Sequence, residues 1–467
     1  MQSMISLSQI TQMNNIKPNC LEIKSIPYKP DLATQLFSSI QNQPWSMLLR
    51  SPTRTHADSR FDVLVSQPIA TISTIGDTSY IVKGNNKEAS NENPFDVLNR
   101  LQAELLPHID YSGELPFVGG ALGYFAYDLG RHVERIPTIA SNDLKTPDMA
   151  IGLYEWALIV DHQEQAAFVV GIDVEQKWQW ICSQQKQSSA QFYLTSDWRS
   201  NMTKQSYSEK FAQVEEYIRS GDCYQINLAQ RFSASYQGSE WDAYQKLEQV
   251  NQGPFSAFIR TDIGAILSVS PERFLQLKDK KIETKPIKGT RPRSSDPHTD
   301  AQAAYDLANA EKDQAENLMI VDLLRNDIGR VAKPGTVHVP KLFDIESFPA
   351  VHHLVSTVCA ELDQQHNATD LLKASFPGGS ITGAPKVRAM EIIEELEPHR
   401  RSAYCGSIGY ISRHGNMDTS ITIRTLVAEQ GAIHVWAGGG LVADSQCDAE
   451  YQETLDKLSR ILPVLTQ

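Results

Sequence analysis

The stretch KPIKGTRPR, from Lys285 to Arg293, places four cationic side chains and two prolines within nine residues. Three explanations compete: a basic patch for a polyanion, a solvated loop, or a pocket in which one lysine does chemistry. The formal net charge of the chain is −13, so its average surface repels nucleic acid and anionic membranes. A polyanion-binding patch is therefore disfavoured, whereas the solvated loop and the reactive lysine both stay open.

Two groups of carboxylates lie on predicted helices. The C-terminal segment AEYQETLDKLSRIL carries Glu450, Glu453 and Lys457, which fall within an arc of roughly 60° on a helix. A second group, Asp313 and Glu316, comes just before the apolar run LMIVDLL. Mg²⁺ takes one or a few carboxylate oxygens and keeps waters for the rest, so the two groups together suggest a magnesium site. The alternative is a solvated face with an ordinary Glu453–Lys457 pair.

Three further segments have the properties of an anion site. SFPGGSITGAPKVRAMEIIEELEP runs from a glycine-rich loop into a predicted helix that starts at Pro385, and such a junction aims backbone N–H groups at an anion. GNMDTSITIRTLV alternates as a strand that places Ser420, Thr422 and Arg424 on one face. The glycines of HVWAGGGLVADS allow a ligand to approach the backbone closely. A carboxylate clamped by Arg424 is one interpretation; a conventional helix start and an exposed edge charge are the others.

These residues must be positioned by a large, mixed fold. The chain has 467 residues, of which 41% are hydrophobic, a composition typical of a globular protein with more than one layer of core. Strands are predicted in RFDVLVSQPIATIST and MAIGLYEWALIVDH, a helix with a serine N-cap in SYSEKFAQVEEYIRSGD, a hairpin in AILSVSPERFLQLKDKKIETKPI, and one long helix in DAQAAYDLANAEKDQAENLMIVDLLRND. No regular βαβ alternation is present, so we predict an α+β fold of antiparallel sheets with helices packed outside.

The ends and the cysteines exclude several classes of protein. The N-terminus lacks a basic region followed by an apolar run, and no stretch of about 18 apolar residues occurs, so we expect a cytoplasmic protein. The six cysteines are scattered without metal-ligand spacing, so neither a disulfide framework nor a zinc site is predicted. The polar stretch 183–205 is the best candidate for a boundary between a lobe at 1–190 and a region at 200–462.

Seven segments together resemble the chorismate-utilising enzymes. SPERF, PIKGT, AENLMIVDLLRND, FPGGSITGAPK, ITIRT, AGGGLVADS and AEYQET occur in the order typical of that family. The resemblance covers about residues 200–462 and is weaker over 1–190, where WSMLLRSP is the recognisable piece. Within the family the chain resembles the aminodeoxychorismate synthase branch (component I), because Lys288 stands where anthranilate-forming relatives typically have alanine. The resemblance implies two large antiparallel sheets packed together. It also implies an N-terminal lobe at 1–190 that is followed in the chain by a catalytic region at 200–462.

The resemblance also implies roles for individual residues. Lys288 and Glu272 are expected to be catalytic, together with His353, for which a purely structural role is the alternative. Glu316, Glu450 and Glu453 are expected to bind Mg²⁺, with Asp313 acting through a water. The substrate is expected to be held by Thr290, Ser380, Tyr404, Arg424, Gly440 and Lys457.

The expected reaction is the amination of chorismate at C4. Neutral Lys288 would attack C2 while the C4 hydroxyl leaves, and ammonia would then add at C4 as the lysine leaves. Glu272 would serve as the acid for the hydroxyl and the base for ammonia; an ion pair with Arg273 or a nearby cation is its alternative. Lys285, Arg291 and Arg293 are sequence neighbours with charges that would lower the pKa of Lys288.

Other members of the family form anthranilate or isochorismate. Gln225 stands where isochorismate synthases have a lysine base, and Asn317 where anthranilate synthases usually have histidine, so both products are disfavoured. A non-catalytic sensor of aromatic metabolites is the remaining alternative, because Ser51, Pro254 and Phe255 resemble the family's tryptophan pocket.

Ammonia is expected to come from outside the chain. The nucleophile elbow of glutamine amidotransferases, Gly-x-Cys-x-Gly, is missing from the sequence. The expected partner is therefore a separate glutaminase subunit, component II, which would form a heterodimer with this chain.

Overall fold

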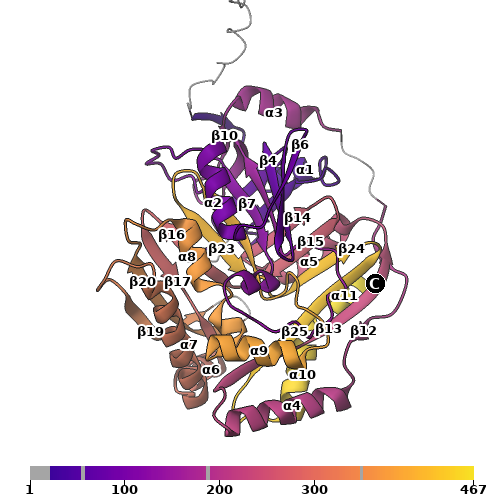
Figure 1. Ribbon diagram of the computed structural model, residues 1–467, viewed down its shortest axis with the longest axis vertical. Helices are drawn as coiled ribbons and strands as arrows, with labels where there is room; N and C mark the ends of the chain where they lie inside the picture. The colour runs from indigo at the N-terminus through magenta and orange to yellow at the C-terminus, as the bar shows by residue number, and fades with distance from the viewer. Residues whose placement is uncertain (1–20, 54–57, 186–189, 348–350, 467) are drawn as a thin grey trace, which may run out of the picture.

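Alternating side chains of the strands enter different layers of the molecule. In β14 (Phe255–Arg260), Ala257 and Ile259 belong to a core that draws on both sheets, whereas Phe258 packs in a second core beneath the helices. This is the period of two that a strand buried on both faces must have. The computed structural model describes residues 21–53, 58–185, 190–347 and 351–466, and Figure 1 shows the sheets with helices around them.

The first sheet has thirteen strands among the described residues, and all its pairings are antiparallel. Its order is β1 (Glu22–Ile26), β10 (Ala166–Gly171), β9 (Trp156–Asp161), β3 (Phe61–Val65), β2 (Met47–Arg50), β14, β15 (Gly264–Ser270), β24 (Thr425–Glu429), β25 (Ala432–Leu441), β13 (Gln225–Gln237) and β11 (Tyr193–Leu194), with β12 (Arg199–Ser200) and β21 (Gly383–Ala384) also paired to β13.

The second sheet has twelve described strands and is antiparallel as well. Its order is β18 (Ile287–Pro292), β20 (Val351–Glu361), β17 (Lys281–Thr284), β16 (Arg273–Lys278), β23 (Met417–Ile421), β22 (Ser407–Ser412), β7 (Gly120–Phe125), β8 (Met149–Tyr154), β4 (Ala70–Ile75), β5 (Thr78–Lys83) and β6 (Asn86–Ser90), with β19 (His338–Ser347) paired to β20. The predicted α+β fold with two large antiparallel sheets is confirmed.

Helices cover the sheets. The described α-helices are α1 (Leu32–Phe37), α2 (Pro94–Leu105), α3 (Val174–Ser183), α4 (Lys204–Arg219), α5 (Glu240–Asn251), α6 (Pro297–Ala308), α7 (Glu311–Gly329), α8 (Ala368–Ser375), α9 (Lys386–Leu396), α10 (Cys447–Leu458) and α11 (Leu462–Thr466), and two short 3₁₀ helices are η1 (Tyr127–His132) and η2 (Gly379–Ile381). No described helix is long and apolar enough to cross a membrane. Strands from residues before 190 and after 200 share both sheets.

The chain passes from one sheet to the other at two adjacent points. Pro271 and Glu272 separate β15, in the first sheet, from β16, in the second, and residues 422–424 separate β23 from β24 in the opposite direction. The two crossings are hydrogen-bonded, because the Ile421 N–H donates to the Glu272 carbonyl (3.0 Å) and the Val269 N–H to the Arg424 carbonyl (3.1 Å). Residues at these crossings therefore lie close together.

Three local predictions need correction. The strand predicted across Arg424 is interrupted there, since Arg424 has φ +50°. The helix predicted from 300 to 327 is two helices, because Ala310 between α6 and α7 has an extended backbone (φ −76°, ψ 97°). The N-cap of α4 is Thr203, whose side chain accepts from the Ser206 N–H, and not a serine. The hairpin predicted after residue 264 is confirmed for β16 and β17.

Candidate active site

Lys288 lies at the centre of the candidate site. It is a half-buried residue of β18, and its ammonium group donates to the Ser380 carbonyl at 3.5 Å. Burial is the largest influence on its pKa and lowers it below the ordinary value, and the positive charge of Lys457 lowers it further. The carboxylates of Glu316 and Glu272 act in the opposite direction. The pKa of this lysine is depressed overall, as a nucleophilic amine requires.

The other cations of KPIKGTRPR do not surround Lys288. Lys285 lies 3.7 Å from a carboxylate oxygen of Glu346, Arg291 pairs with Asp313 at 3.0 Å, and Arg293 pairs with Asp300 at 2.7 Å. The prediction that these sequence neighbours tune Lys288 is therefore wrong, since each is paired with a carboxylate of its own. The cation that does act on Lys288 is Lys457, which is remote in the sequence.

Gly289 is required for the packing of this strand. Its φ is +81°, and an added Cβ would lie 2.8 Å from the carboxyl carbon of Asp313. A side chain at this position would therefore push α7 away from β18. Asp313, which is expected to reach a metal through water, forms an ion pair with Arg291.

Glu272 approaches Lys288 from the crossing between the sheets. The Ser380 hydroxyl donates to its carboxylate at 3.2 Å, so Ser380 contacts both Lys288 and Glu272. Burial raises the pKa of Glu272 to about 7, although Lys288, the Ser380 hydrogen bond and Lys457 all lower it. The suggested ion pair with Arg273 does not form, because Arg273 pairs with Asp58 (2.5 Å) and Asp418 (3.0 Å).

The acidic residues converge from α7 and α10. Burial raises the pKa of both Glu316 and Glu450, and the negative charge of Glu450 raises that of Glu316 further. A Cβ added at Gly439 would lie 3.1 Å from a carboxylate oxygen of Glu450 and 3.7 Å from one of Glu453. The glycine therefore leaves room for two of the three predicted metal ligands.

This arrangement fits Mg²⁺ as a partial coordination set. Within the described part of the chain, no three His, Cys, Asp or Glu side chains are gathered closely enough to hold a metal ion by themselves. Mg²⁺ in enzymes is often held by one or two carboxylates, with waters and substrate oxygens in the remaining positions. The hard oxygen donors of α7 and α10 suit that mode of binding.

The predicted substrate residues fall into separate groups. Lys457 donates to the Gly438 carbonyl (2.8 Å) and pairs with Glu453 (2.7 Å), as its i,i+4 spacing predicted. Tyr404 is 3% exposed and stacks on Trp436, with centroids 6.2 Å apart and an interplanar angle of 6°. The side chain of Arg424 is exposed at the crossing between β23 and β24.

Thr290 and His353 form a pair on adjacent strands. They are register partners on β18 and β20, and the Thr290 hydroxyl lies 2.8 Å from Nδ1 of His353. Thr290 lies two residues after Lys288 on β18, so the contact places His353, on the neighbouring strand β20, close to this part of β18. The geometry is compatible with a role in the site and with a structural role.

Gln225, which stands where isochorismate synthases have a lysine base, lies against the predicted substrate residue Gly440. Its side chain is fully buried, and neither amide atom has a hydrogen-bond partner among the described residues. A Cβ added at Gly440 would lie 2.3 Å from its amide nitrogen, so the glycine makes room for this side chain. A buried amide without a partner is unfavourable unless a ligand or a water satisfies it, and this feature is visible only in three dimensions.

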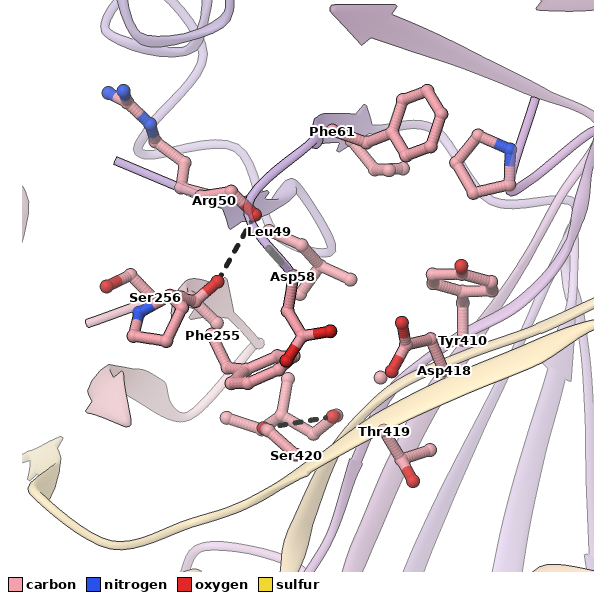
Figure 2. A pocket seen from close by; sticks show the side chains of 17 residues that line it. Leu49, Arg50, Asp58, Phe61, Phe255, Ser256, Tyr410, Asp418, Thr419 and Ser420 are labelled. Carbon is pink, nitrogen blue, oxygen red and sulfur yellow. Dashed lines mark hydrogen bonds between the residues drawn. The ribbon is translucent and has the colours of Figure 1, made fainter. Parts of the chain in front are cut away.

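A cavity lies between the two sheets, and Lys288 is not among the residues that line it. Its lining includes Ser51, Pro254 and Phe255, so the structure brings together the three residues of the predicted tryptophan pocket. Figure 2 shows Phe255 among the side chains that line this cavity. The Ser51 hydroxyl donates to the Pro254 carbonyl at 3.2 Å. The guanidinium of Arg273 lies over the Phe255 ring at 5.0 Å from its centroid.

Comparisons with known proteins identify the relatives of this chain. The family model described as chorismate binding enzyme matches residues 46–463. Aminodeoxychorismate synthase component 1 of Salmonella typhimurium is 55% identical over 96% of this chain and 99% of its own length, and that of Escherichia coli K12 is 56% identical over 94% and 97%.

Solved structures agree with this grouping. Anthranilate synthase component I from Streptococcus pneumoniae superposes with a TM-score of 0.77 at 32% identity, covering 86% of this chain and 92% of the other. The menaquinone-specific isochorismate synthase of Escherichia coli superposes with a TM-score of 0.73 over 96% of this chain and 95% of the other. At 17% identity, the second likeness shows the fold alone.

Proposed function

The chain belongs to the family of chorismate binding enzymes, and we propose that it converts chorismate and ammonia into 4-amino-4-deoxychorismate. The relatives with this activity in their name are 55% and 56% identical over nearly the whole chain. The observation that carries the proposal within the site is Lys288, a lysine of depressed pKa that shares Ser380 with a carboxyl of raised pKa.

Lys288 is the proposed nucleophile. Its depressed pKa increases the fraction of neutral amine, which forms a bond to C2 of chorismate while the two ring double bonds shift and the C4–oxygen bond breaks. Ammonia then forms a bond to C4, the two double bonds shift back, and the C2–nitrogen bond breaks to release the lysine. The two displacements return the amine of Lys288 unchanged.

Glu272 is the proposed acid and base. With a pKa of about 7, it is populated in both protonation states near neutral pH. In its protonated form it donates to the leaving hydroxyl, which departs as water. The resulting carboxylate takes the proton that the added ammonia loses, so the step is balanced in protons and needs no further reactant.

The carboxylates of Glu316, Glu450 and Glu453 would hold Mg²⁺. When bound, the ion supplies positive charge that neutralises a substrate carboxylate. Lys457 lies at the same end of the site and adds a second positive charge. The remaining substrate contacts are proposed for Arg424, Tyr404, Ser380, Thr290, His353 and Gly440.

The proposal includes a partner and a second ligand. The name component 1 of the relatives implies a second component, and we propose a separate glutaminase that supplies ammonia to this chain in the cytoplasm. The cavity lined by Ser51, Pro254 and Phe255 is proposed to bind tryptophan, since it encloses both an aromatic ring and a buried polar wall. We propose that the N-terminal lobe at 1–190 and the catalytic region at 200–462 both contribute strands to the same two sheets.

Product analysis tests this function. The purified chain is incubated with chorismate, MgCl₂ and an ammonium salt at alkaline pH, and the products are identified by mass spectrometry. We expect a product that carries an amine and retains the enolpyruvyl group. Anthranilate with pyruvate, or isochorismate, would contradict the proposal, and unchanged chorismate with tryptophan bound would favour the sensor alternative.

A further inference from the structure

Arg401 is a fully buried cation next to the candidate site and has no role in the chemistry described so far. It is 1% exposed and follows α9 in the chain. Its guanidinium donates to both carboxylate oxygens of Glu397, at 3.0 and 2.6 Å. Glu397 is 4% exposed and also accepts from the Ala229 N–H at 2.9 Å.

The remaining donors of Arg401 reach two backbone segments of the site. One terminal nitrogen donates to the Ile381 carbonyl at 2.9 Å, and the other donates to the Asn227 carbonyl at 2.6 Å. Ile381 directly follows Ser380 in η2, and Asn227 is two residues along β13 from Gln225. The guanidinium therefore ties the turn that contacts Lys288 to the strand that carries the buried amide.

Arg401 also contacts the predicted substrate-binding ring. Its guanidinium carbon lies 5.7 Å from the centroid of the Tyr404 ring and 4.8 Å from that of Tyr127. The backbone adds to this contact, because the Tyr404 N–H donates to the Arg401 carbonyl at 3.0 Å. One side chain thus fixes three separate components of the site.

We propose that Arg401 is a positioning residue for the amination reaction, acting through Ile381 to hold Ser380 against Lys288 and Glu272. The inference rests on the proposed function. Ser380 presents its carbonyl to the lysine and its hydroxyl to the carboxyl, so a displacement of η2 changes both contacts at once. Displacements of about 1 Å at reacting groups can lower a rate by about 100-fold.

Arginine is needed here because of its geometry as well as its charge. A planar guanidinium presents five donors in a fixed arrangement, whereas a lysine ammonium is a point charge with three donors on a flexible stem. Arg401→Lys keeps the positive charge next to Glu397 but cannot span Glu397, Ile381 and Asn227 together. The substitution therefore separates positioning from the charge balance of the core.

The matched control is Arg413→Lys. Arg413 is 3% exposed and donates to the Pro107 carbonyl at 3.1 Å. It follows the C-terminal end of β22, whereas Tyr404 precedes the N-terminal end of that strand. For each variant, kcat and KM for chorismate are measured with saturating ammonium and Mg²⁺, together with the unfolding temperature. We expect kcat of Arg401→Lys to fall by about 10- to 100-fold with KM changed less than about 3-fold, and kcat of Arg413→Lys to stay within about 2-fold of the parent.

A double-mutant cycle with Ser380→Ala provides the readout that a purely structural role would not move. If Arg401 acts through Ser380, the double variant loses clearly less activity than the product of the two single losses. Ser380→Ala combined with Arg413→Lys is expected to be multiplicative. Equal kcat in Arg401→Lys and Arg413→Lys, or a multiplicative Arg401–Ser380 cycle, would overturn the inference.

Two further measurements keep the outcomes distinct. If Arg401→Lys does not fold, Glu397→Gln replaces it in the test, because it weakens the hydrogen bonds to the Arg401 guanidinium without removing that group. An unchanged kcat in Glu397→Gln would overturn the inference. The parent chain is assayed in parallel: a parent that makes no 4-amino-4-deoxychorismate refutes the proposed function, whereas a fully active parent with an unaffected Arg401→Lys variant refutes only the positioning role.

Discussion

Replacing Glu272 with glutamine is expected to stabilise the folded protein above pH 7 while it removes the activity. Burial raises the pKa of this carboxyl from 4.5 to about 7, so the folded protein holds a carboxylate in an unfavourable environment at alkaline pH. Each pKa unit corresponds to about 1.4 kcal/mol, which gives about 3 kcal/mol in total. Because the side chain is only half-buried, solvent screening reduces the expected effect to about 1–2 kcal/mol.

The sign of the pH dependence follows from the protons bound. Between pH 4.5 and about 7 the folded state retains the proton on Glu272 and the unfolded chain has lost it. The free energy of unfolding contributed by this group is therefore fully present below pH 4.5 and is lost as pH rises to about 7. Glutamine does not titrate, so the variant and the parent should be similar near pH 5 and differ most at pH 8.

Urea unfolding at pH 5 and pH 8 measures this difference, with Glu283→Gln in β17 as a control for losing a half-buried carboxylate elsewhere. The same preparations are assayed for amination, where loss of the acid and base should lower kcat by about 10²- to 10⁴-fold. The assignment of a buried, destabilised carboxyl would be refuted if the variant were less stable than the parent at pH 8. It would also be refuted if the free energies of unfolding of the two proteins differed by the same amount at pH 5 and pH 8.

Three other substitutions test separate parts of the site. Lys288→Ala should lower the formation of 4-amino-4-deoxychorismate by more than about 10³-fold, measured by mass spectrometry, whereas Lys285→Ala should retain it; normal product from the first variant would disprove the covalent role. Gly439→Ala should weaken Mg²⁺ binding by about 10-fold in calorimetry, because its Cβ would lie 3.1 Å from Glu450, and Gly329→Ala, in open space, should not. Phe255→Ala should abolish the rise in unfolding temperature that tryptophan gives the parent, and the cavity would need another ligand if tryptophan gives no such rise.

The sequence was most informative where a local motif decides chemistry. The segments around Lys288, Ser380 and Glu450 predicted a family that the comparisons confirm. Periodicity also predicted the hairpin at β16 and β17, and the resemblance to the family implied the two large antiparallel sheets. In these cases the information lies in short segments and their order along the chain, so the packing of the chain was not needed to read it.

The interrupted elements show what local patterns omit. The alternation of GNMDTSITIRTLV continues through Arg424, yet the chain changes sheets there, and nothing in the period of two marks a crossing. Similarly, the Ala- and Leu-rich segment from 300 to 327 contains good helix formers throughout, but Ala310 leaves the helical conformation so that α6 and α7 can both pack near β18 and β20. Tertiary packing overrides a propensity of a few tenths of a kcal/mol per residue.

The groups that lower the pKa of Lys288 were also not evident from the local sequence. Three cations adjacent in the sequence were expected to depress its pKa, but strand geometry and the α6–α7 pair give each of them a carboxylate partner. Burial between β18 and η2, with Lys457 from α10, does so instead. A pKa reflects distance and desolvation in the folded state, so the identity of a nucleophile can be inferred from a motif, whereas the groups that activate it have to be read from the fold.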